Sequence, residues 1–391
     1  MRTRIGLLTG GGDAPGLNSC LKTIVYDAIS QGYEVVGIRK GWEGLIAYDP
    51  ADPMTHANNA MIMTKSRVRS IDRSAGSFLH SSRLNPGAVK LQDLPPFLSK
   101  RGGAEEKVDL TEHIKRVIEH LQLDGIILLG DGAALNYAAR LSQEGVPVVA
   151  IPKSVHNDIA GTAYSLGFST AVGRGVQFVH EVRETAASRE EIAVVSVLGR
   201  QSGVSTMLIG LLAGTDRTLI PQFPCNPEQL AKLLLADKRT TPNNYAILTM
   251  SEGARIEPDK LALYGHDFER MANLMKQRSN GALVSYVLQE IIGQRVLHQP
   301  LSYLLRTGVP DGWDLLTATN FGVIAVHLVS EGHYGRMVAF IPKKGPIDVP
   351  IERINQPHRL KIEEFYDAAT YQPKRSIFKA ATGGTLMDDW E

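Results

Sequence analysis

The sequence predicts an α/β protein built from two doubly wound lobes, and three observations support this fold class. A short apolar run, a glycine turn and a helical pattern follow one another at residues 5–38, again at 126–151, and a third time around 192–210. Repeated βαβ units of this kind favour mostly parallel sheets, with ligands at the carboxyl ends of the strands. A chain of 391 residues exceeds what one hydrophobic core usually fills, so two lobes are expected.

The first of these units shows the pattern most clearly. The apolar run 5–9 predicts a strand, and the glycines at 10–12 predict a tight turn. A helical pattern opens at Pro15, with apolar residues spaced three and four positions apart. Gly32 ends this helix, and residues 35–38 predict the next strand.

The second unit repeats this order, and the region before it breaks the pattern. A strand from Ile126 leads through the turn 130–132 to a helix at 133–142 and a strand at 146–151. Residues 86–107 are rich in proline and glycine, which predicts a surface loop or an insertion.

Composition and charge exclude several classes of protein. Lys plus Arg (42) nearly balance Asp plus Glu (41), which removes the broad positive field expected of a nucleic-acid or anionic-membrane binder. The two cysteines, Cys20 and Cys225, lie far apart, as expected in a reducing compartment. The N-terminus does not look like a signal peptide, and no run approaches roughly 18 to 20 apolar residues. We therefore expect a cytoplasmic protein with no nucleic-acid or membrane partner.

The first glycine turn, GGGDAPGLN at 10–18, fits a phosphate-binding loop. Glycines between a strand and a helix let backbone N–H groups approach an anion, and the helix N-terminus adds a favourable dipole. The loop is not a Walker A motif, because no GK[ST] follows, and it lacks the GxGxxG spacing of a dinucleotide fold. On glycine content alone, a tight turn without a ligand is the alternative interpretation.

Later turns carry charged side chains. Asp131, in GDGAA at the tip of the second strand, can hold Mg²⁺ directly or through water, although an Asp-Gly pair also forms ordinary turns. The loop PKSVHND at 152–158 includes His156, which fits a general base, a hydrogen-bonding ligand or a structural histidine. Three arginines follow apolar runs and can either fork onto phosphate oxygens or form surface ion pairs: Arg83, Arg200 and Arg306.

Taken in order, these segments resemble the phosphofructokinase family, which includes the bacterial ATP-dependent and pyrophosphate-dependent 6-phosphofructokinases. The resemblance runs from Arg4 to about Ala368. It rests on LTGGGDAPGLN, GWEGL at 41–45, GSFLHSSRLNP at 76–86, LLGDGAA, PKSVHNDIAGTAYSLGF, VLGRQSG at 197–203, LLRTG and GRMVAF.

The resemblance implies a phosphofructokinase-like pair of Rossmann-like lobes that divide the two substrates between them. Residues 1–167 and 305–355 are expected to form the donor lobe, which binds ATP and magnesium. Residues 168–304 and 356–370 are expected to form the acceptor lobe, which binds the sugar. Residues 371–391 carry little periodicity and predict a packed or mobile tail. The family also implies a homodimer or homotetramer.

The resemblance assigns a role to each matching residue. Gly11 and Arg83 would contact the donor phosphates, and Asp131 would hold Mg²⁺. Asp158 matches the second aspartate of the family's TIDND loop. On the acceptor side, the matching residues are Ser154 from the same loop, Gly199 and Arg200 in the family's MGR turn, and Arg306, which matches the arginine that grips the acceptor's 6-phosphate.

Two positions are associated with the choice of donor in this family. The residue after the magnesium-site aspartate is glycine in ATP users and aspartate in many pyrophosphate users, and here it is Gly132. The second position is glycine in simple ATP users and lysine in pyrophosphate users, and here it is Lys153. An aspartate at 132 would crowd and repel the α-phosphate of ATP, whereas Lys153 need not exclude it. We therefore expect ATP as the donor, with pyrophosphate as the alternative.

The acceptor side departs from the family pattern. His156 stands where the family has the aspartate that takes the proton from the attacking hydroxyl. A neutral imidazole can act as a base, but it carries no negative charge. Gln222 replaces a glutamate that hydrogen-bonds the sugar, and Tyr303 replaces a phosphate-binding histidine, a change also found in pyrophosphate users. Both remain expected acceptor contacts.

Two arginines that the family uses for the 6-phosphate fall on other residue types here. Glu191 replaces one, with Arg189 two positions away. Leu297 replaces the other, with Arg295 the nearest candidate. Charge-assisted contacts to a phosphate are worth too much to be lost together while the same acceptor is kept. We therefore expect a working phosphoryl-transfer enzyme whose acceptor need not be fructose 6-phosphate.

The expected mechanism is in-line transfer of the γ-phosphoryl group of ATP to a sugar hydroxyl. His156, alone or oriented by Asp158, would receive the proton, while Arg200 and Arg306 would position the acceptor. Three alternatives stay open. They are pyrophosphate as the donor, a non-catalytic nucleotide-sensing family member, and a nicotinamide-dependent oxidoreductase, which the missing GxGxxG spacing argues against.

Overall fold

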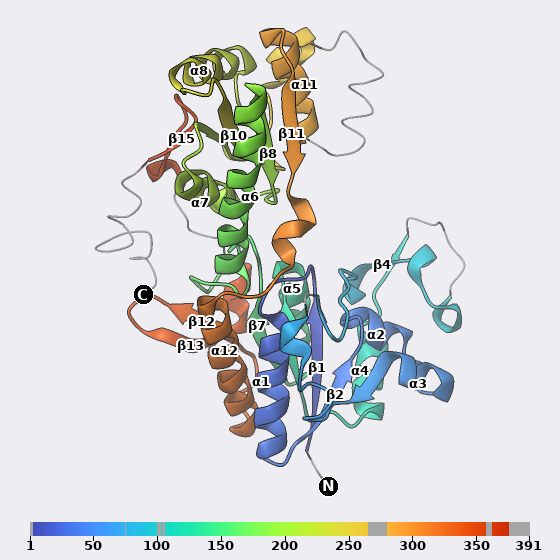
Figure 1. Ribbon diagram of the computed structural model, residues 1–391. Coiled ribbons are helices and arrows are strands. Elements are labelled where there is room, and N and C mark those ends of the chain that lie inside the picture. Colours follow the sequence, from blue (N-terminus) through green and yellow to red (C-terminus); the bar gives the residue numbers. More distant parts are fainter. Residues whose placement is uncertain are drawn as a thin grey trace. The chain divides into compact units, whose positions relative to one another are not determined.

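The computed structural model divides the chain into two compact units, each with its own main sheet (Figure 1). The first unit comprises Met1–Ser169 and Arg306–His358, and the second comprises Thr170–Leu305 and Arg359–Glu391. Which unit binds the donor and which the acceptor stays a prediction. The residues that the structure describes are 3–74, 76–99, 103, 106–264, 280–356 and 362–374.

A mostly parallel sheet forms the centre of the first unit. Its strands lie in the order β13-β12-β7-β6-β1-β2-β3, and only the two outer strands run antiparallel to their neighbours. The inner strands β6 and β7 are apolar and fully buried, as expected for parallel strands covered on both faces. The strands are β1 (Arg4–Gly10), β2 (Glu34–Ile38), β3 (Ala60–Ile62), β6 (Gly125–Gly130), β7 (Val148–Pro152), β12 (Arg336–Ile341) and β13 (Gly345–Pro350).

Helices cover both faces of this sheet. α1 (Leu17–Ser30) and α12 (Gly312–Ser330) lie side by side (Figure 1). They pack against alternate residues of the strands, such as Ile5 and Leu7. α5 (Gly132–Gln143) packs on β6 and β7 from the other face. The remaining helices are α2 (Trp42–Ala47), α3 (Pro53–Asn59) and α4 (Thr111–His120), with short 3₁₀ turns η1 (Ile71–Arg73) and η7 (Ile351–Asn355).

The segment predicted as a loop at 86–107 contains short ordered elements. They are the 3₁₀ turns η2 (Pro86–Ala88), η3 (Leu91–Asp93) and η4 (Pro96–Leu98) and the paired strands β4 (Val89–Lys90) and β5 (Lys107–Val108). Prolines at the first positions of η2 and η4 fit these turns, because proline needs no N–H partner there.

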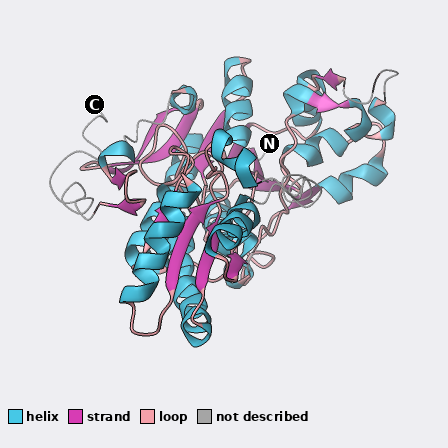
Figure 2. Ribbon diagram, turned by 90° about the horizontal axis from the view of Figure 1, so that it is seen from above, coloured by secondary structure: helices cyan, strands magenta, loops and turns pink. Residues whose placement is uncertain are grey.

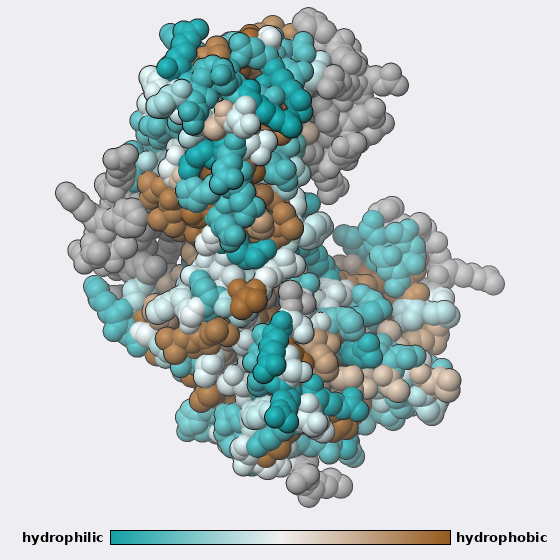
Figure 3. Space-filling view, viewed as in Figure 1, coloured by the Kyte–Doolittle hydropathy of each residue, from teal (hydrophilic) through white to brown (hydrophobic). Residues whose placement is uncertain are grey.

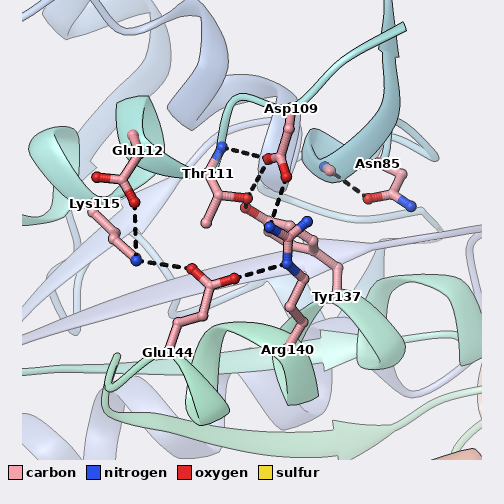
Figure 4. Close-up of polar contacts among 9 residues, drawn as sticks. Asn85, Asp109, Thr111, Glu112, Lys115, Tyr137, Arg140 and Glu144 are labelled. Atoms are coloured by element: carbon pink, nitrogen blue, oxygen red, sulfur yellow. Dashed lines mark hydrogen bonds and ion pairs between the residues drawn. The ribbon is translucent and has the colours of Figure 1, made fainter.

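A polar network fastens the end of this segment to α4 and α5 (Figure 4). Asp109 accepts hydrogen bonds from the Thr111 backbone N–H at 2.9 Å and from Arg140 Nη2 at 2.6 Å. Arg140 also pairs with Glu144 at 2.8 Å, and Glu144 pairs with Lys115 of α4 at 2.8 Å. The two helices are therefore joined by a chain of charges that lies at the surface.

The second unit is built on a four-stranded sheet in which every strand pairing is parallel. Its strands lie in the order β11 (Val296–Pro300), β8 (Ile192–Val197), β10 (Ala246–Ser251) and β9 (Arg217–Leu219). Figure 2 shows helices in cyan beside the magenta strands. The helices are α6 (Phe168–Arg189), α7 (Val204–Ala213), α8 (Pro227–Thr240), α9 (Pro258–Leu261) and α11 (Asn280–Ile292), with 3₁₀ turns η5 (Ala262–Tyr264) and η6 (Ser302–Arg306). The parallel sheets confirm the predicted α/β class.

The described part of the C-terminal region packs against the second unit. η8 (Ile362–Glu364) leads into β14 (Tyr366–Asp367), which pairs with β15 (Gln372–Pro373). Tyr371 is buried in the core of this unit, and its hydroxyl accepts a hydrogen bond from the Asn226 backbone N–H at 3.0 Å. The predicted tail 371–391 therefore begins as packed structure, and residues 375–391 lie outside the described residues.

α12 has the composition of a core helix. Within the described part of the chain, it is the one helix long and apolar enough to cross a membrane, and half of its most apolar window is buried inside the structure. Its exposed face carries Trp313, Leu316 and Val323. Figure 3 shows brown hydrophobic patches among teal and white residues on the face in view. Packing against α1 and the sheet accounts for the apolar character of the buried face.

A buried carboxylate joins α12 to the chain before α6. Asp314 is 0% exposed, and its Oδ1 accepts hydrogen bonds from the Tyr164 hydroxyl at 2.8 Å and from the Gly167 backbone N–H at 2.7 Å. Asp311 caps α12 and accepts a hydrogen bond from Ser169 Oγ at 2.6 Å. Both acids lie at the positive end of the helix dipole, which favours their charge.

Replacing Asp314 is expected to destabilise the first unit. In Asp314→Ala, the buried Tyr164 hydroxyl and Gly167 N–H lose their acceptor, which should lower the free energy of unfolding by about 2–4 kcal/mol. Denaturant unfolding followed by circular dichroism measures this loss. Arg140→Ala, in the exposed network of Figure 4, is the comparison and should cost less than about 1 kcal/mol. Equal losses in the two variants would contradict the structural role given to Asp314.

Candidate functional site

The candidate site lies at the carboxyl ends of neighbouring strands in the first unit. β1 pairs with β2 on one side and with β6 on the other, so the connections leave the sheet in opposite directions at this point. In open α/β sheets, ligands bind in the crevice outside such a topological switch point. Gly10, the last residue of β1, pairs with Gly130, the last residue of β6. The loops that begin at Gly11 and at Asp131 therefore start side by side.

The first loop depends on a glycine at position 11. Gly11 has a φ of +85°, in the left-handed region, and a Cβ there would lie 2.0 Å from Cγ of Asp131. Its N–H donates to the Ser82 carbonyl at 2.8 Å, and Ser81 Oγ donates to the Gly11 carbonyl at 2.6 Å. The segment that carries the predicted donor ligand Arg83 is thus held beside the loop.

Asp131 lies between the glycine loop and the start of α5. It is the N-cap of α5, where its Oδ1 accepts from the Ala134 N–H at 3.3 Å. Its Oδ2 accepts from the Gly12 N–H, also at 3.3 Å. Because both hydrogen bonds are long and the side chain is only half-buried, its oxygens have capacity for another ligand.

The donor atoms at this site suit a magnesium ion held mainly by phosphates. The described residues contain no group of three or more His, Cys, Asp or Glu side chains that could hold a metal by themselves. Mg²⁺ prefers oxygen ligands and is usually bound by one or two carboxylates together with substrate phosphates and water. A single half-exposed carboxylate beside a phosphate loop fits this pattern, and Asp131 is the residue that would hold the ion.

Lys153 is a buried cation beneath the glycine loop. It follows β7, is 1% exposed, and its Nζ donates to the Gly12 carbonyl at 2.6 Å. Burial lowers the pKa of Lys153 to about 8, although the carboxylates of Asp131 and Asp13 act in the opposite direction. A buried ammonium is stabilised by nearby negative charge, so this position favours an anion at the loop.

Two arginines lie against the same glycine loop. A Cβ at Gly12 would lie 2.5 Å from Arg306 Nη1 and 2.9 Å from Arg83 Nη2. Arg306 Nη1 also donates to the Asp13 carbonyl at 3.3 Å. The structure therefore brings Arg83, Arg306 and Lys153 together around Gly12, although they are far apart in sequence. Three cations around backbone amides are the chemistry expected of a polyphosphate site.

The loop after β7 holds three of the predicted residues in a chain of hydrogen bonds. Ser154 Oγ donates to Asp158 Oδ1 at 2.6 Å and accepts from the His156 backbone N–H at 3.1 Å. His156 Nε2 lies 3.2 Å from Arg306 Nη2. Burial lowers the pKa of His156, and the positive charges of Arg306 and Arg83 lower it further, against the carboxylates of Asp158 and Asp131. The imidazole is therefore neutral at pH 7.

Asp13 and Asn18 belong to this site, although the sequence analysis did not single them out. Asp13 Oδ1 accepts from the Ser77 N–H at 3.2 Å. Asn18 Nδ2 donates to the Gly76 carbonyl at 2.7 Å, and its Oδ1 accepts from the Phe78 N–H at 2.8 Å. Both residues fasten the segment around 76–78 to the glycine loop. Their place inside GGGDAPGLN was the available signal.

Four predicted acceptor residues lie in the second unit, at or after the carboxyl ends of its strands. Gly199 follows β8 with a φ of +148°, and a Cβ there would lie 2.5 Å from the Ser202 carbonyl. Arg200 and Gln222 are exposed, and Gln222 Nε2 donates to the Gln201 carbonyl at 3.0 Å. Tyr303 follows β11 and is 74% exposed. Their roles remain predictions.

Glu191, at one altered 6-phosphate position, and Arg295, the candidate nearest to the other position at Leu297, lie at the opposite end of the strands of that sheet. Glu191 precedes β8 and Arg295 precedes β11, so both lie at the amino ends of paired parallel strands. Arg295 Nε is 3.7 Å from Glu191 Oε1. The charge of Arg295 is thus partly balanced by Glu191. Whether Arg295 or Arg189 contacts a phosphate remains a prediction.

A methyl group at Gly11 is expected to disrupt the donor site. Gly11→Ala would place Cβ in the space of the Asp131 carboxyl group and force it to move. A displacement of about 1 Å can cost about a hundredfold in activity, and a comparable loss of affinity for magnesium-bound ATP is expected. Isothermal titration calorimetry measures this affinity. Gly145→Ala, also at a positive φ but with open space around its Cβ, is the matched control. Wild-type affinity in Gly11→Ala would contradict the assignment.

Comparison with known proteins identifies the family of the chain. A family model described as phosphofructokinase matches residues 4–329. An ATP-dependent 6-phosphofructokinase 3 of Streptomyces coelicolor is 31% identical over 344 residues, covering 86% of this chain and 90% of the relative. A pyrophosphate--fructose 6-phosphate 1-phosphotransferase of Amycolatopsis methanolica is also 31% identical, over 338 residues, with 86% and 90% covered.

Solved structures show the same fold. A pyrophosphate-dependent phosphofructokinase from Nitrosospira multiformis superposes with a TM-score of 0.75 at 14% identity, covering 98% of this chain and 92% of the other. One from Marinobacter aquaeolei gives a TM-score of 0.74 at 15% identity, with 96% and 89% covered. The expected phosphofructokinase-like fold is thereby confirmed. The chain belongs to the phosphofructokinase family, whose members are kinases that phosphorylate a sugar hydroxyl.

Proposed function

We propose that this protein transfers the γ-phosphoryl group of magnesium-bound ATP to a hydroxyl group of a sugar or sugar phosphate. Family membership supports the reaction class. The observation that carries the proposal is the convergence of Asp131, Lys153 and Arg83 on the glycine loop at the switch point of the first unit. An ordinary nicotinamide-dependent oxidoreductase is not favoured, because the family is one of kinases and the glycine loop lacks the GxGxxG spacing of a dinucleotide-binding fold.

The residues of the first unit would act mainly by positioning the donor and neutralising its charge. The backbone N–H groups of the glycine loop, Arg83 and Lys153 would bind the phosphate oxygens, and Asp131 would hold Mg²⁺, which when bound neutralises charge on the donor. The acceptor oxygen then forms a bond to the γ-phosphorus while the bond to the bridging oxygen breaks and ADP leaves. Preorganised cations suit this step, because the protein acts by stabilising charge and forms no covalent bond with the transferred group.

ATP is proposed as the donor because of the space at Gly132. A Cβ at Gly132 would meet no other atom within 4 Å, so the start of α5 leaves room for a large donor. Pyrophosphate is the alternative, supported by Lys153 at the loop and by relatives named for either donor. Lys153 Nζ bonds to the Gly12 carbonyl, which is compatible with a role in supporting the loop under either donor.

The acceptor is proposed to be a sugar or sugar phosphate, with fructose 6-phosphate as the family default. Relatives named for fructose 6-phosphate support that default. The altered residues at Glu191 and Leu297 weaken the case for a 6-phosphate, because an acid and an apolar side chain do not bind one. The proposed acceptor contacts remain Ser154 and Arg306 of the first unit and Gly199, Arg200, Gln222 and Tyr303 of the second. Fructose 6-phosphate and a neutral sugar therefore both belong in the assay.

Assembly is proposed from the family, and location from the sequence. We infer a homodimer or homotetramer in the cytoplasm, acting on small molecules and without a nucleic-acid or membrane partner. The near balance of 42 basic and 41 acidic residues supports the small-molecule part of this proposal. A non-catalytic, nucleotide-sensing role is the second candidate, and the observation that favours it is His156 at the position of the family's base aspartate.

A substrate screen tests the proposed function. ATP and pyrophosphate, each with Mg²⁺, are combined with fructose 6-phosphate and a panel of sugars, sugar phosphates and polyols, and phosphorylated product is measured by ³¹P NMR. We expect transfer from ATP that requires Mg²⁺. Asp131→Asn should lower turnover at least about a hundredfold, because the ion loses its protein ligand. Asp93→Asn, at an exposed aspartate in η3, is the control. ATP binding without transfer to any acceptor would instead support the nucleotide-sensing role.

A substitution at Gly132 tests the choice of donor. Gly132→Asp would place a carboxylate near the donor phosphates, and like-charge repulsion should lower kcat/KM for ATP at least about tenfold. Because nothing lies within 4 Å of the added Cβ, stability should change little. Gly312→Asp is the matched control, since Gly312 also follows an aspartate N-cap at the first position of a helix. An unchanged kcat/KM for ATP in Gly132→Asp would contradict ATP binding at this position.

A further inference from the structure

The contact between His156 and Arg306 fixes where the imidazole carries its proton. His156 Nε2 and Arg306 Nη2 are 3.2 Å apart. A guanidinium group has N–H donors and no acceptor, so Nε2 must be the acceptor in this hydrogen bond. A neutral ring with an unprotonated Nε2 carries its proton on Nδ1.

Neither nitrogen of this ring is then placed to receive a second proton. The lone pair of Nε2 is directed to Arg306. Nδ1 already carries the proton, is buried, and has no hydrogen-bond partner among the residues that the structure describes. A general base must come within hydrogen-bond reach of the proton that it abstracts. The imidazole of His156 is therefore better placed to hold an arginine than to take a proton from a hydroxyl group.

Asp158 has the complementary arrangement. Its Oδ1 is held by Ser154 Oγ at 2.6 Å, and Ser154 Oγ is itself held by the His156 backbone N–H at 3.1 Å. Within the described part of the chain, Oδ2 of Asp158 has no hydrogen-bond partner, and the side chain is exposed. One oxygen thus fixes the orientation of the carboxylate while the other is open to a substrate hydroxyl.

We propose that Asp158 accepts the proton of the attacking hydroxyl and that His156 is a positioning residue, which holds the Arg306 guanidinium beside the glycine loop. This inference rests on the proposed function. In the reaction, the hydroxyl proton passes to Asp158 Oδ2 as the acceptor oxygen bonds to the γ-phosphorus. The electron pair of the broken bond stays on the bridging oxygen of ADP. The exposed Asp158 then releases the proton to water.

A pair of substitutions at His156 distinguishes the two roles. Glutamine places an amide oxygen near the position of Nε2 and can accept the hydrogen bond from Arg306, but it cannot take up a proton at neutral pH. Leucine can do neither. We expect His156→Leu to lower kcat/KM by about tenfold to a hundredfold, the worth of a hydrogen bond to a charged group. If His156→Leu loses more than about tenfold in kcat/KM, His156→Gln should recover at least about tenfold of that loss. If the loss is smaller, His156→Gln should recover most of it. If His156 were the base, both variants would lose turnover equally.

Asp158→Asn is the companion variant. The amide keeps the size of the side chain and an acceptor for Ser154, but it cannot accept a proton at neutral pH. We expect a loss of about 10² to 10⁴ in kcat, with little change in the affinity for magnesium-bound ATP. His327→Gln, on the exposed end of α12, controls for loss of an imidazole. Thermal unfolding of each variant shows that it has folded.

The measurements separate failure of this inference from failure of the proposed function. If the wild-type protein transfers no phosphoryl group to any acceptor, the proposed function fails. If the wild type is active but His156→Gln is as impaired as His156→Leu, His156 is not a positioning residue for Arg306. Retention of wild-type kcat by Asp158→Asn would likewise overturn the assignment of Asp158 as the proton acceptor.

Discussion

The contact of the Asp131 carboxyl group with the backbone of Gly11 and Gly12 is the constraint on which the candidate site depends. No side chain can occupy the space at Gly11, because a Cβ would lie 2.0 Å from the carboxyl carbon. The absent side chain lets a carboxylate approach the N–H of Gly12, at the point where the first loop and α5 both begin. The parallel pairing of Gly10 with Gly130 brings these two starts together. The sheet thus places a carboxylate beside backbone amides at the carboxyl ends of its strands.

The charges around this contact explain why the loop is suited to bind an anion and is more than a structural turn. Lys153 is buried under Gly12, and burial is the main reason that its pKa falls to about 8. Arg83 and Arg306 approach the same glycine from other segments. Such a group of cations carries a desolvation cost that a bound polyphosphate would offset. A solvated surface loop would give no reason to bury a lysine.

The fold was more predictable from sequence than the side-chain contacts were. Periodicity predicted the strand, turn and helix order of the first unit, because buried parallel strands and amphipathic helices leave different patterns. It did not predict the 3₁₀ turns and short strand pair within 86–107, where proline and glycine indicate only that regular helices are absent. Nor did it indicate that Tyr371 is buried in the second unit, because one aromatic residue in an aperiodic stretch does not show which side of the segment faces the core.

By itself, the sequence determined the α/β class and the positions of the glycine turns, because local spacing records which residues are buried and where the backbone must turn. The resemblance of its motifs placed the chain in a family. Only the tertiary structure decided which distant residues meet. Lys153 forms a hydrogen bond with Gly12, 141 positions away, and Arg306 forms one with His156, 150 positions away. A hydrogen bond of this kind depends on atoms brought within about 3 Å by strand order and loop geometry, and one-dimensional spacing does not record that distance.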